Sequence, residues 1–334
     1  MNNTKVPYSR IAEALDISVA TVSRALKQPN LVKPETLRKI YAVIKELGGT
    51  VPETRALDAG GSRRILAITP ILTNPFYTDV LQGIRNASKQ NGCTLLILNE
   101  TLSKSNIGGV LKLIAQTDIS GVILLQRVDD AVLGQLSDRV AVVQCSEFNE
   151  SGSVPCVTID NLDATKKLMR YLISTGKKRI VLVNCDPDRY TYARLRLHGY
   201  REALLAAGIE QDPSMIITIP DGSFSATVSA VSAMLKSTEP PEAIFCVSDI
   251  MAAAALRACA LEGLQVPGDI IVAGFDNTDI SVMTTPNITT VSQPRFTIAS
   301  MALTQLLSVI ANPSQQPQRY LVDTELILRE STGV

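Results

Sequence analysis

Residues 18–26 bring hydroxyl groups, small side chains and one arginine together on a short predicted helix. Val22 and Leu26 lie one turn apart and face a core, while Ser18 precedes the helix and can accept a hydrogen bond from its first turn. Hydroxyls on the remaining face can bind phosphate oxygens, and an arginine can bind a base edge in a major groove. The residues with this DNA-contacting chemistry are Ser18, Val19, Ala20, Thr21, Ser23 and Arg24.

Two neighbouring helices complete a small three-helix unit. A helix over residues 8–15 contributes Ile11 to the same core, and a third helix begins at Pro34 and ends near residue 47. The tight segment 15–17 joins the first two helices, as in a helix-turn-helix motif. It contains Asp16 where glycine is usual, and aspartate tolerates a left-handed backbone better than most residues. The alternative to DNA binding is an ordinary three-helix element that packs against the rest of the chain.

Charge is distributed unevenly along the chain. The whole sequence holds 32 basic and 32 acidic residues, but its first 64 residues hold 11 Lys and Arg against 6 Asp and Glu. The remainder therefore carries 21 basic and 26 acidic residues. Residues 1–64 therefore carry a net charge of +5 and the remaining residues a net charge of −5. This concentrates the attraction for phosphate on the N-terminal unit. A merely solvated charged surface explains this segregation less well.

Length and composition indicate a globular protein of two or three domains. The chain has 334 residues, of which 46% are hydrophobic and 19% charged. It contains no apolar run near 18 residues and no secretory segment at its N-terminus, so we expect a cytoplasmic location. The cysteines form no CxxC pair, and we expect them to be core residues rather than metal ligands or disulfides. They are Cys93, Cys145, Cys156, Cys185, Cys246 and Cys259.

Beyond residue 64, short apolar runs alternate with amphipathic helical stretches. Near-continuous apolar strands separated by helices indicate a parallel sheet covered on both faces. Nine strands are many for one open sheet, so we expect two α/β lobes with a ligand-binding cleft outside the carboxyl ends of the strands. The predicted strands are 65–69, 94–98, 121–125, 140–144, 156–159, 179–183, 215–218, 243–247 and 270–273, and the helices include 77–91, 161–174, 193–207, 225–236 and 249–262.

The sequence contains none of the common catalytic or cofactor-binding motifs. His198 is the single histidine, and no GxSxG, GxxxxGK(S/T), GxGxxG or HExxH pattern is present. We therefore expect no enzymatic activity, cofactor or metal. Two alternatives to a DNA-binding regulator are a transport-type binding protein, which requires an export signal, and a cytoplasmic two-domain α/β sugar- or nucleoside-binding protein or enzyme with a helical appendage.

Five segments together resemble the lactose-repressor/galactose-repressor family of bacterial transcription regulators. They occur in the family's order and spacing over nearly the whole chain. Residues 144–148, 159–162 and 292–296 are most similar to the cytidine-repressor branch of that family. The five segments are ATVSRAL at 20–26, NPFY at 74–77, RLRLHGY at 194–200, SDIMA at 248–252 and GFDN at 274–277.

The resemblance implies three parts: a helix-turn-helix DNA-binding domain over residues 1–48, a hinge or linker over 49–64, and an effector-binding and dimerisation core over 65–334. The core is implied to be similar to periplasmic binding proteins, with lobe N over 65–160 and 291–321 and lobe C over 161–290 and 322–334. The implied partners are double-stranded operator DNA, a second copy of the chain and a nucleoside- or sugar-like effector. The cytidine-repressor branch also allows a second transcription factor, and repression is the implied sense of regulation.

The resemblance also implies which residues contact the operator. Val19 and Ala20 face bases and Arg24 contacts a guanine, while Ser18, Thr21 and Ser23 hold phosphates. A short hinge helix is implied around Arg55 and Leu57, with Leu57 inserted into the minor groove at the operator centre. The alternatives are a plain phosphate contact for Arg24 and a packing contact for Leu57.

An effector is implied to lie in the cleft between the lobes, in contact with Phe76, Tyr77, Asp160, Arg196, Phe224 and Asp276. The aromatic members offer flat faces to a base or sugar ring, and Asp160 lies at a crossover between the lobes. Arg196 and Asp276 are the favoured pair for effector hydroxyls, the arginine through two hydrogen bonds. Asp249 is expected to cap the helix that follows it rather than to contact the effector.

Overall fold

The computed structural model describes residues 6–27, 32, 34–47 and 63–334, and the chain separates into two compact units, Met1–Ser62 and Arg63–Val334. The hinge positions Arg55 and Leu57 lie outside the described residues, so their implied roles stay predictions.

The N-terminal unit contains three helices around one small core. They are α1 (Tyr8–Leu15), α2 (Val19–Lys27) and α3 (Pro34–Glu46). Asp16 turns the chain between α1 and α2 with a left-handed φ of 50°, which confirms the predicted tight turn. The buried side chains come from all three helices, as the spacing of apolar residues predicts, and they are Ile11, Ala12, Val22, Ala25, Ile40 and Ile44.

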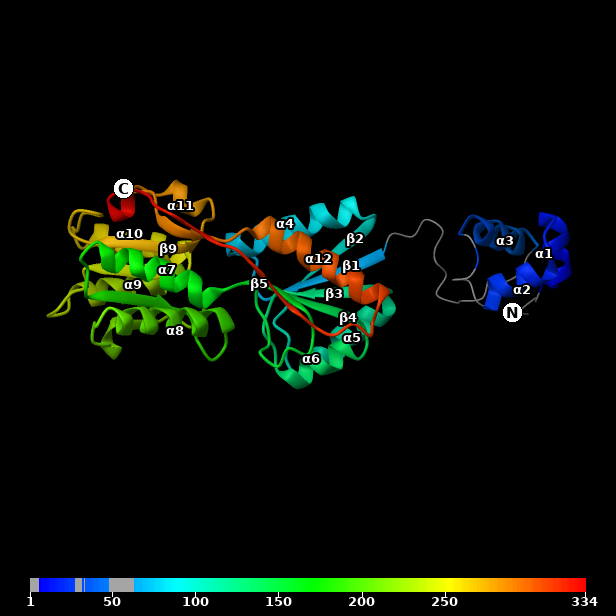
Figure 1. The fold of residues 1–334 in the computed structure, drawn as a ribbon, viewed down its shortest axis with the longest axis horizontal. Coiled ribbons are helices and arrows are strands. Elements are labelled where there is room, and N and C mark those ends of the chain that lie inside the picture. The colour runs from blue at the N-terminus through cyan, green and yellow to red at the C-terminus, as the bar shows by residue number, and fades with distance from the viewer. Residues whose placement is uncertain (1–5, 28–31, 33, 48–62) are drawn as a thin grey trace. The chain divides into compact units, whose positions relative to one another are not determined.

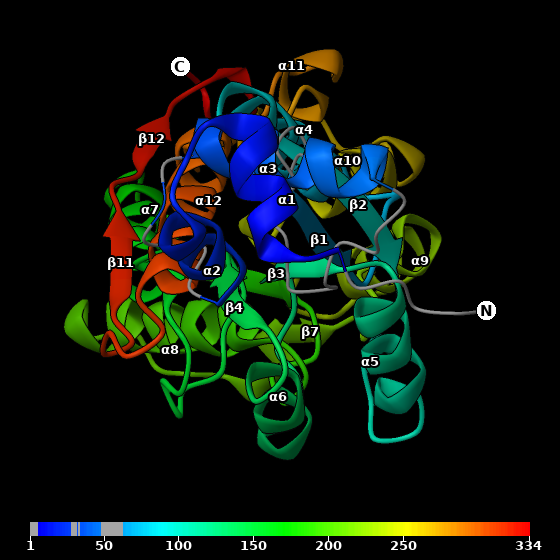
Figure 2. The same cartoon turned by 90° about the vertical axis from the view of Figure 1, so that its right-hand side faces the viewer.

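The core unit contains two lobes, each built on a six-stranded sheet (Figure 1). The sheet of lobe N has the order β11-β5-β4-β3-β1-β2, and every pairing in it is parallel. Figure 2 shows β11 and β2 at opposite edges of this sheet. Its strands are β1 (Arg63–Thr69), β2 (Cys93–Asn99), β3 (Ile119–Leu124), β4 (Ala141–Cys145), β5 (Cys156–Ile159) and β11 (Arg319–Val322).

Helices cover both faces of the lobe N sheet because successive strand residues point to opposite sides. Ile65 and Ala67 of β1 belong to the cluster under α4 (Pro75–Gln90) and α12 (Arg295–Ala311). Leu66 and Ile68 belong to the cluster under α5 (Ile107–Gln116) and α6 (Asp130–Ser137). Both faces of this central strand are therefore buried, which explains its uninterrupted apolar sequence.

Lobe C repeats this design with the strand order β12-β10-β9-β8-β6-β7. Its pairings are parallel except that β10 and β12 run antiparallel at the edge. Its strands are β6 (Ile180–Asn184), β7 (Ile216–Thr218), β8 (Ala243–Cys246), β9 (Ile271–Asp276), β10 (Thr289–Ser292) and β12 (Glu325–Ile327), and its helices are α7 (Asn161–Ser174), α8 (Thr191–Ala206), α9 (Phe224–Leu235), α10 (Asp249–Leu261) and α11 (Ile280–Met283).

The chain passes between the lobes three times, after β5, after β10 and between β11 and β12 (Figure 1). The boundaries differ slightly from those expected. Arg63 and Arg64, assigned to the linker, are the exposed first residues of β1, where they pair with Cys93 and Thr94. The second crossing falls after Ser292 rather than near Thr290, because β10 pairs along its whole length with β9.

Two further observations concern the cysteines and the lengths of the helices. All six cysteines are buried and free, which confirms that they are core residues. None of the helices described is long and apolar enough to cross a membrane.

Candidate functional site

The exposed face of α2 carries the small side chains and the arginine expected to contact DNA. Val22 and Ala25 are fully buried, whereas Val19 is 48% exposed, and Ala20 and Arg24 are also exposed. This division follows from the helical period, which directs positions 22 and 25 to one side. Thr21 and Ser23 lie half-buried between the two faces. The exposed face therefore presents an arginine beside two small residues, which lets a helix approach a groove closely.

Ser18 has the capping role that the sequence predicts. Its Oγ accepts a hydrogen bond from the Thr21 backbone N–H at 3.0 Å, and its hydroxyl lies 2.8 Å from the Thr21 hydroxyl. Both hydroxyls are thus held at the N-terminus of α2. The free N–H groups and the helix dipole there favour negative charge.

Arg196 and Asp276, the favoured pair in the predicted effector site, do lie together in lobe C. Arg196 Nη1 is 3.9 Å from Asp276 Oδ1, and both residues are buried. The guanidinium also lies over the Phe275 ring, 3.5 Å from its centroid, and 4.9 Å from that of Tyr192. Its Nε donates to Asn161 Oδ1, and Nη1 donates to the Val247 carbonyl. Arg196 on α8 is therefore held by contacts with α7, with β9 and with the residue that follows β8.

Asp276 ends β9 in an unusual conformation. Its φ is 113° and that of Asn277 is 55°, so two successive non-glycine residues occupy the left-handed side of the Ramachandran map. Burial raises the pKa of the Asp276 carboxyl, which Arg196 opposes and Asp249 reinforces. The carboxylate accepts a hydrogen bond from Gln293 Nε2 at 2.7 Å. A strained, buried carboxylate at the carboxyl end of a parallel strand is typical of a ligand-binding position.

Phe76 and Tyr77 open α4 in lobe N, where Pro75 and the Asn74 side chain start the helix. Their rings pack edge to face with centroids 5.5 Å apart, and both are more than 90% buried. Tyr77 lines a cavity of about 20 Å³ that also includes Glu147 of lobe N and Tyr190 of lobe C. A drug-sized ligand needs several hundred Å³. The lobes must therefore separate before such a ligand can reach Tyr77.

The remaining predicted residues are placed less centrally. The exposed Asp160 caps α7 by accepting from the Asp163 N–H at 2.9 Å, and Phe224, the first residue of α9, is 43% exposed. The prediction that Asp249 caps its helix is wrong. Asp249 is already within α10, and its buried carboxylate accepts hydrogen bonds from Thr278 and Thr290. These donors are distant in the sequence, and through them the carboxylate ties α10 to strand β10 and to the loop after β9 instead of capping a helix end.

Glu147, which joins the two lobes, was not predicted from the sequence. It lies two residues beyond β4, and its carboxylate oxygens accept hydrogen bonds from the N–H groups of Thr191 and Tyr192 at the start of α8. The Thr191 hydroxyl donates to the Phe148 carbonyl at 2.8 Å. Burial raises the pKa of Glu147 to about 7, although the two N–H donors and Arg196 oppose this shift. The position just after a buried strand was the signal that could have identified it.

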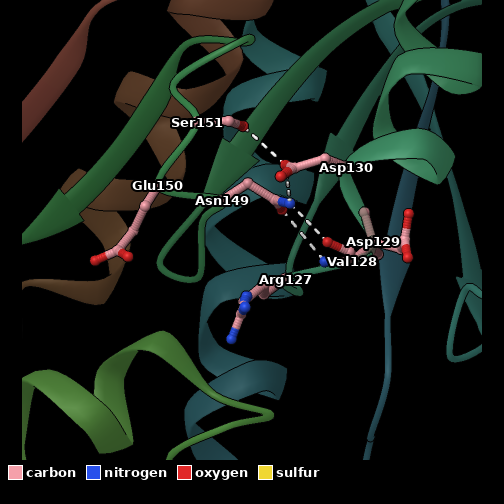
Figure 3. A pocket seen from close by; sticks show the side chains of 7 residues that line it. All are labelled: Arg127, Val128, Asp129, Asp130, Asn149, Glu150 and Ser151. Atoms are coloured by element: carbon pink, nitrogen blue, oxygen red, sulfur yellow. Dashed lines mark hydrogen bonds between the residues drawn. The ribbon is translucent and has the colours of Figure 1, made fainter.

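A larger cavity of about 390 Å³ lies in lobe N beside the loops 127–130 and 149–151 (Figure 3). Asn149 bonds to both backbone groups of Val128 and to Asp130, and Ser151 also donates to Asp130. These polar groups already bind one another, so the cavity is lined by a structural network. Arg127 and Glu150 also line the cavity, and they bond to the Asp188 carbonyl and to Arg194 of lobe C. Among the described residues, no group of three His, Cys, Asp or Glu is arranged to hold a metal.

Comparison with known proteins identifies relatives for both the N-terminal unit and the core. Residues 10–48 match the family model for bacterial regulatory proteins of the lacI family, and residues 169–332 match a periplasmic binding protein-like domain. The chain is 34% identical to the HTH-type transcriptional repressor CytR of Escherichia coli over 98% of its own length and 97% of that protein. It is 30% identical to the HTH-type transcriptional regulator CelR of Thermobifida fusca over 96% of both chains.

Solved structures give the same result. A structure described as a transcriptional regulator CelR–cellobiose complex is similar over 98% of this chain and all of that chain, with 27% identity and a TM-score of 0.74. These relatives are DNA-binding regulators rather than enzymes, which confirms that expectation and excludes the enzyme alternative. The helical head, the two-lobed α/β core and the full-length similarity to CytR together show that the chain is a DNA-binding transcription regulator of the LacI family.

Proposed function

We propose that this regulator is a repressor that binds its operator as a homodimer through α2, and that a nucleoside- or pentose-like effector between the core lobes changes its operator affinity. The observation that carries the proposal is the convergence of three groups from two lobes on one buried region. Tyr77 comes from lobe N, and Arg196 and Asp276 come from lobe C. The pKa of Tyr77 is raised by burial, and Glu147 and Asp276 add to that increase, which indicates that these groups lie near one another.

The chemistry of these groups favours a ligand with a flat ring and several hydroxyls. Aromatic faces pack against the ring of a base or sugar, and a guanidinium beside a carboxylate can both donate to and accept from hydroxyl groups. The similar CelR structure is a complex with cellobiose, which supports a carbohydrate-containing ligand in this fold. The relationship to CytR supports the nucleoside class, as does the likeness of residues 144–148 to the cytidine-repressor branch.

Direct hydrogen bonds hold the lobes together around a cavity of about 20 Å³. A ligand that contacts both lobes must favour one arrangement of the lobes over the other in order to shift their equilibrium. That shift is the proposed signal to the DNA-binding heads. Since operator DNA of a bacterial regulator lies in the cytoplasm, we place the protein there.

The proposal can be tested with the full-length chain in two steps. A thermal-shift screen uses cytidine, adenosine, ribose and cellobiose as probes, and duplexes selected from a random pool supply the operator. Each stabilising probe is then titrated with and without the selected duplex, with Asp276→Asn as the comparison variant. We expect a nucleoside or pentose to raise the melting temperature and to change duplex affinity by about 5- to 150-fold. Equal dissociation constants with and without duplex would contradict direct coupling and would favour control through a second transcription factor.

A further inference from the structure

Arg295 connects the two lobes at the point where the chain passes from β10 to α12. It is the first residue of α12, and its Nε lies 2.9 Å from Asp79 Oδ2 on α4. Its Nη1 donates to the main-chain carbonyl of Asp276 at the end of β9. One guanidinium therefore contacts a carboxylate of lobe N and the backbone of the strained residue in lobe C.

The contact with Asp79 is an ion pair. The buried Arg295 Nε makes no aligned hydrogen bond, so charge attraction holds the two groups at this distance. The Arg295 side chain is 13% exposed and that of Asp79 is 34% exposed, so solvent screens the pair less than a surface pair.

The crossing segment is tied to Asp276 a second time. Gln293 donates from Nε2 to the Asp276 carboxylate, and its backbone N–H lies 3.4 Å from the Asp276 carbonyl. Residues 293 and 295 thus bond to both the side chain and the main chain of Asp276. A change in the position of Asp276 must either move this segment or break these bonds.

Helices α12 and α4 pack too closely to move independently, and Figure 1 shows them side by side over the lobe N sheet. A Cβ added at Gly83 of α4 would lie 2.6 Å from Ala299 Cβ and 3.3 Å from Phe296 Cα of α12. Because the helix backbones touch at Gly83, a displacement at the start of α12 is passed to α4. Phe76 and Tyr77 lie in the first turn of the same α4.

From these contacts we propose that Arg295 is a coupling residue, which transmits the state of the effector site at Asp276 to α4 through its ion pair with Asp79. This inference rests on the proposed function, since it assumes an effector at Asp276. Arg295 itself positions other groups and does not contact the effector. The structure has both contacts made, and we expect a second arrangement of the lobes in which the contact to Asp276 is released.

The test separates coupling from binding. Full-length wild type, Arg295→Lys and Asp79→Asn are compared, using cytidine and ribose as probes and the selected duplex as DNA. Lysine keeps the charge but lacks the planar fork that binds two partners at once, and asparagine removes the charge of the partner. Asp163→Asn is the matched control, because it removes a carboxylate from an exposed ion pair with Lys167 on α7.

The expected result is a loss of linkage with both binding sites intact. In both test variants the probe affinity without DNA and the duplex affinity without probe stay within about twofold of wild type. In the wild type each ligand changes the affinity for the other by about 5- to 150-fold, and in the test variants this change disappears. The control keeps the wild-type linkage. Thermal melting of each variant confirms folding.

Three outcomes would overturn the inference, and they are distinguishable. Linkage retained in both test variants contradicts the role of Arg295 and leaves the proposed function standing. A loss of probe affinity without DNA as large as the loss of linkage shows that Arg295 only shapes the pocket. Absence of linkage in the wild type contradicts the proposed function, and the coupling role with it.

Discussion

The Glu147 carboxylate of lobe N accepts a hydrogen bond at 2.9 Å from the backbone N–H of Tyr192 in the first turn of α8 in lobe C. A buried acid therefore serves as a contact between the lobes. Burial raises its pKa from an ordinary value of 4.5 to about 7 in the closed core, whereas solvent exposure after opening would return the pKa toward 4.5. Closure should thus take up a proton between those two pH values.

Raising the pH should consequently favour opening of the lobes. From about pH 5 to about pH 7 the closed form binds more protons than the open form, so its stability relative to the open form falls as pH rises. Above about pH 7 both forms are ionised and the dependence ends. The distance between two fluorophores, one on each lobe, measures this change. Glu147→Gln should reduce the dependence to the part that comes from Asp276, whose pKa burial also raises to about 7, and an unchanged pH profile in that variant would assign the proton to another group.

Arg24→Ala should weaken operator binding and relax its sequence preference. The exposed guanidinium on α2 is suited to a guanine edge, and its loss should cost about 1–3 kcal/mol and remove discrimination at one base pair in each half-site. Anisotropy titrations against the selected duplex and its single-base variants, at one salt concentration, measure both effects. Arg10→Ala, which removes an exposed arginine from α1, is the control for loss of charge alone. If Arg24→Ala weakened every duplex equally, its contact would be with phosphate.

Arg196→Met should destabilise the core far more than Arg194→Met on the same helix. Arg196 is 4% exposed and pairs with buried Asp276, whose pKa burial raises to about 7, so removal of the arginine leaves a buried charge unpaired only above that pH and should cost about 3–5 kcal/mol in alkaline buffer. The Arg194 ion pair with Glu150 is partly exposed and should contribute less than about 1 kcal/mol. Urea unfolding measures both values. The difference between the two losses in unfolding free energy should be smaller at pH 5, because the raised pKa of Asp276 means that its carboxyl is protonated and uncharged there. Equal losses in the two variants would show that Arg196 is not held as the contacts indicate.

The sequence predicts those elements whose local pattern alone determines them. The central strand β1 is buried on both faces, so its run of apolar residues was sufficient. The three strands missed, β10, β11 and β12, are only three or four residues long, and β11 alternates exposed and half-buried residues at a sheet edge. They are strands because the crossing segments bring them beside a sheet that already exists. The sequences of β11 and β12 carry no comparable signal, whereas β10 is a short, mostly buried run of β-branched residues.

The same distinction explains the site residues. Ser18 was predicted correctly because its partner, Thr21, is three residues away. Asp249 was misassigned because its partners are 29 and 41 residues away, and Glu147 was missed because its partners are 44 and 45 residues away. A carboxylate that caps a nearby helix stabilises the protein by about 1 kcal/mol, and hydrogen bonds from hydroxyl donors distant in the sequence can stabilise it by more.

Gly274→Ala tests the buried network around Asp249. An added Cβ would lie 2.6 Å from Asp249 Oδ1 and 3.1 Å from both Ala252 Cβ and Ile288 Cγ2. The carboxylate cannot retreat easily, since hydrogen bonds from Thr278 and Thr290 hold it.

The substitution should therefore lower the free energy of unfolding by about 1–3 kcal/mol through overpacking. Gly134→Ala in α6 is the matched control, because nothing lies within 4 Å of its added Cβ. That change should raise stability by about 0.4–1 kcal/mol, since alanine restricts the unfolded chain and favours the helix. Urea unfolding of both variants measures whether each change lowers or raises the free energy of unfolding. A Gly274→Ala protein as stable as wild type would show that Asp249 moves freely, and the anchoring of β10 and of the loop after β9 by its carboxylate would be wrong.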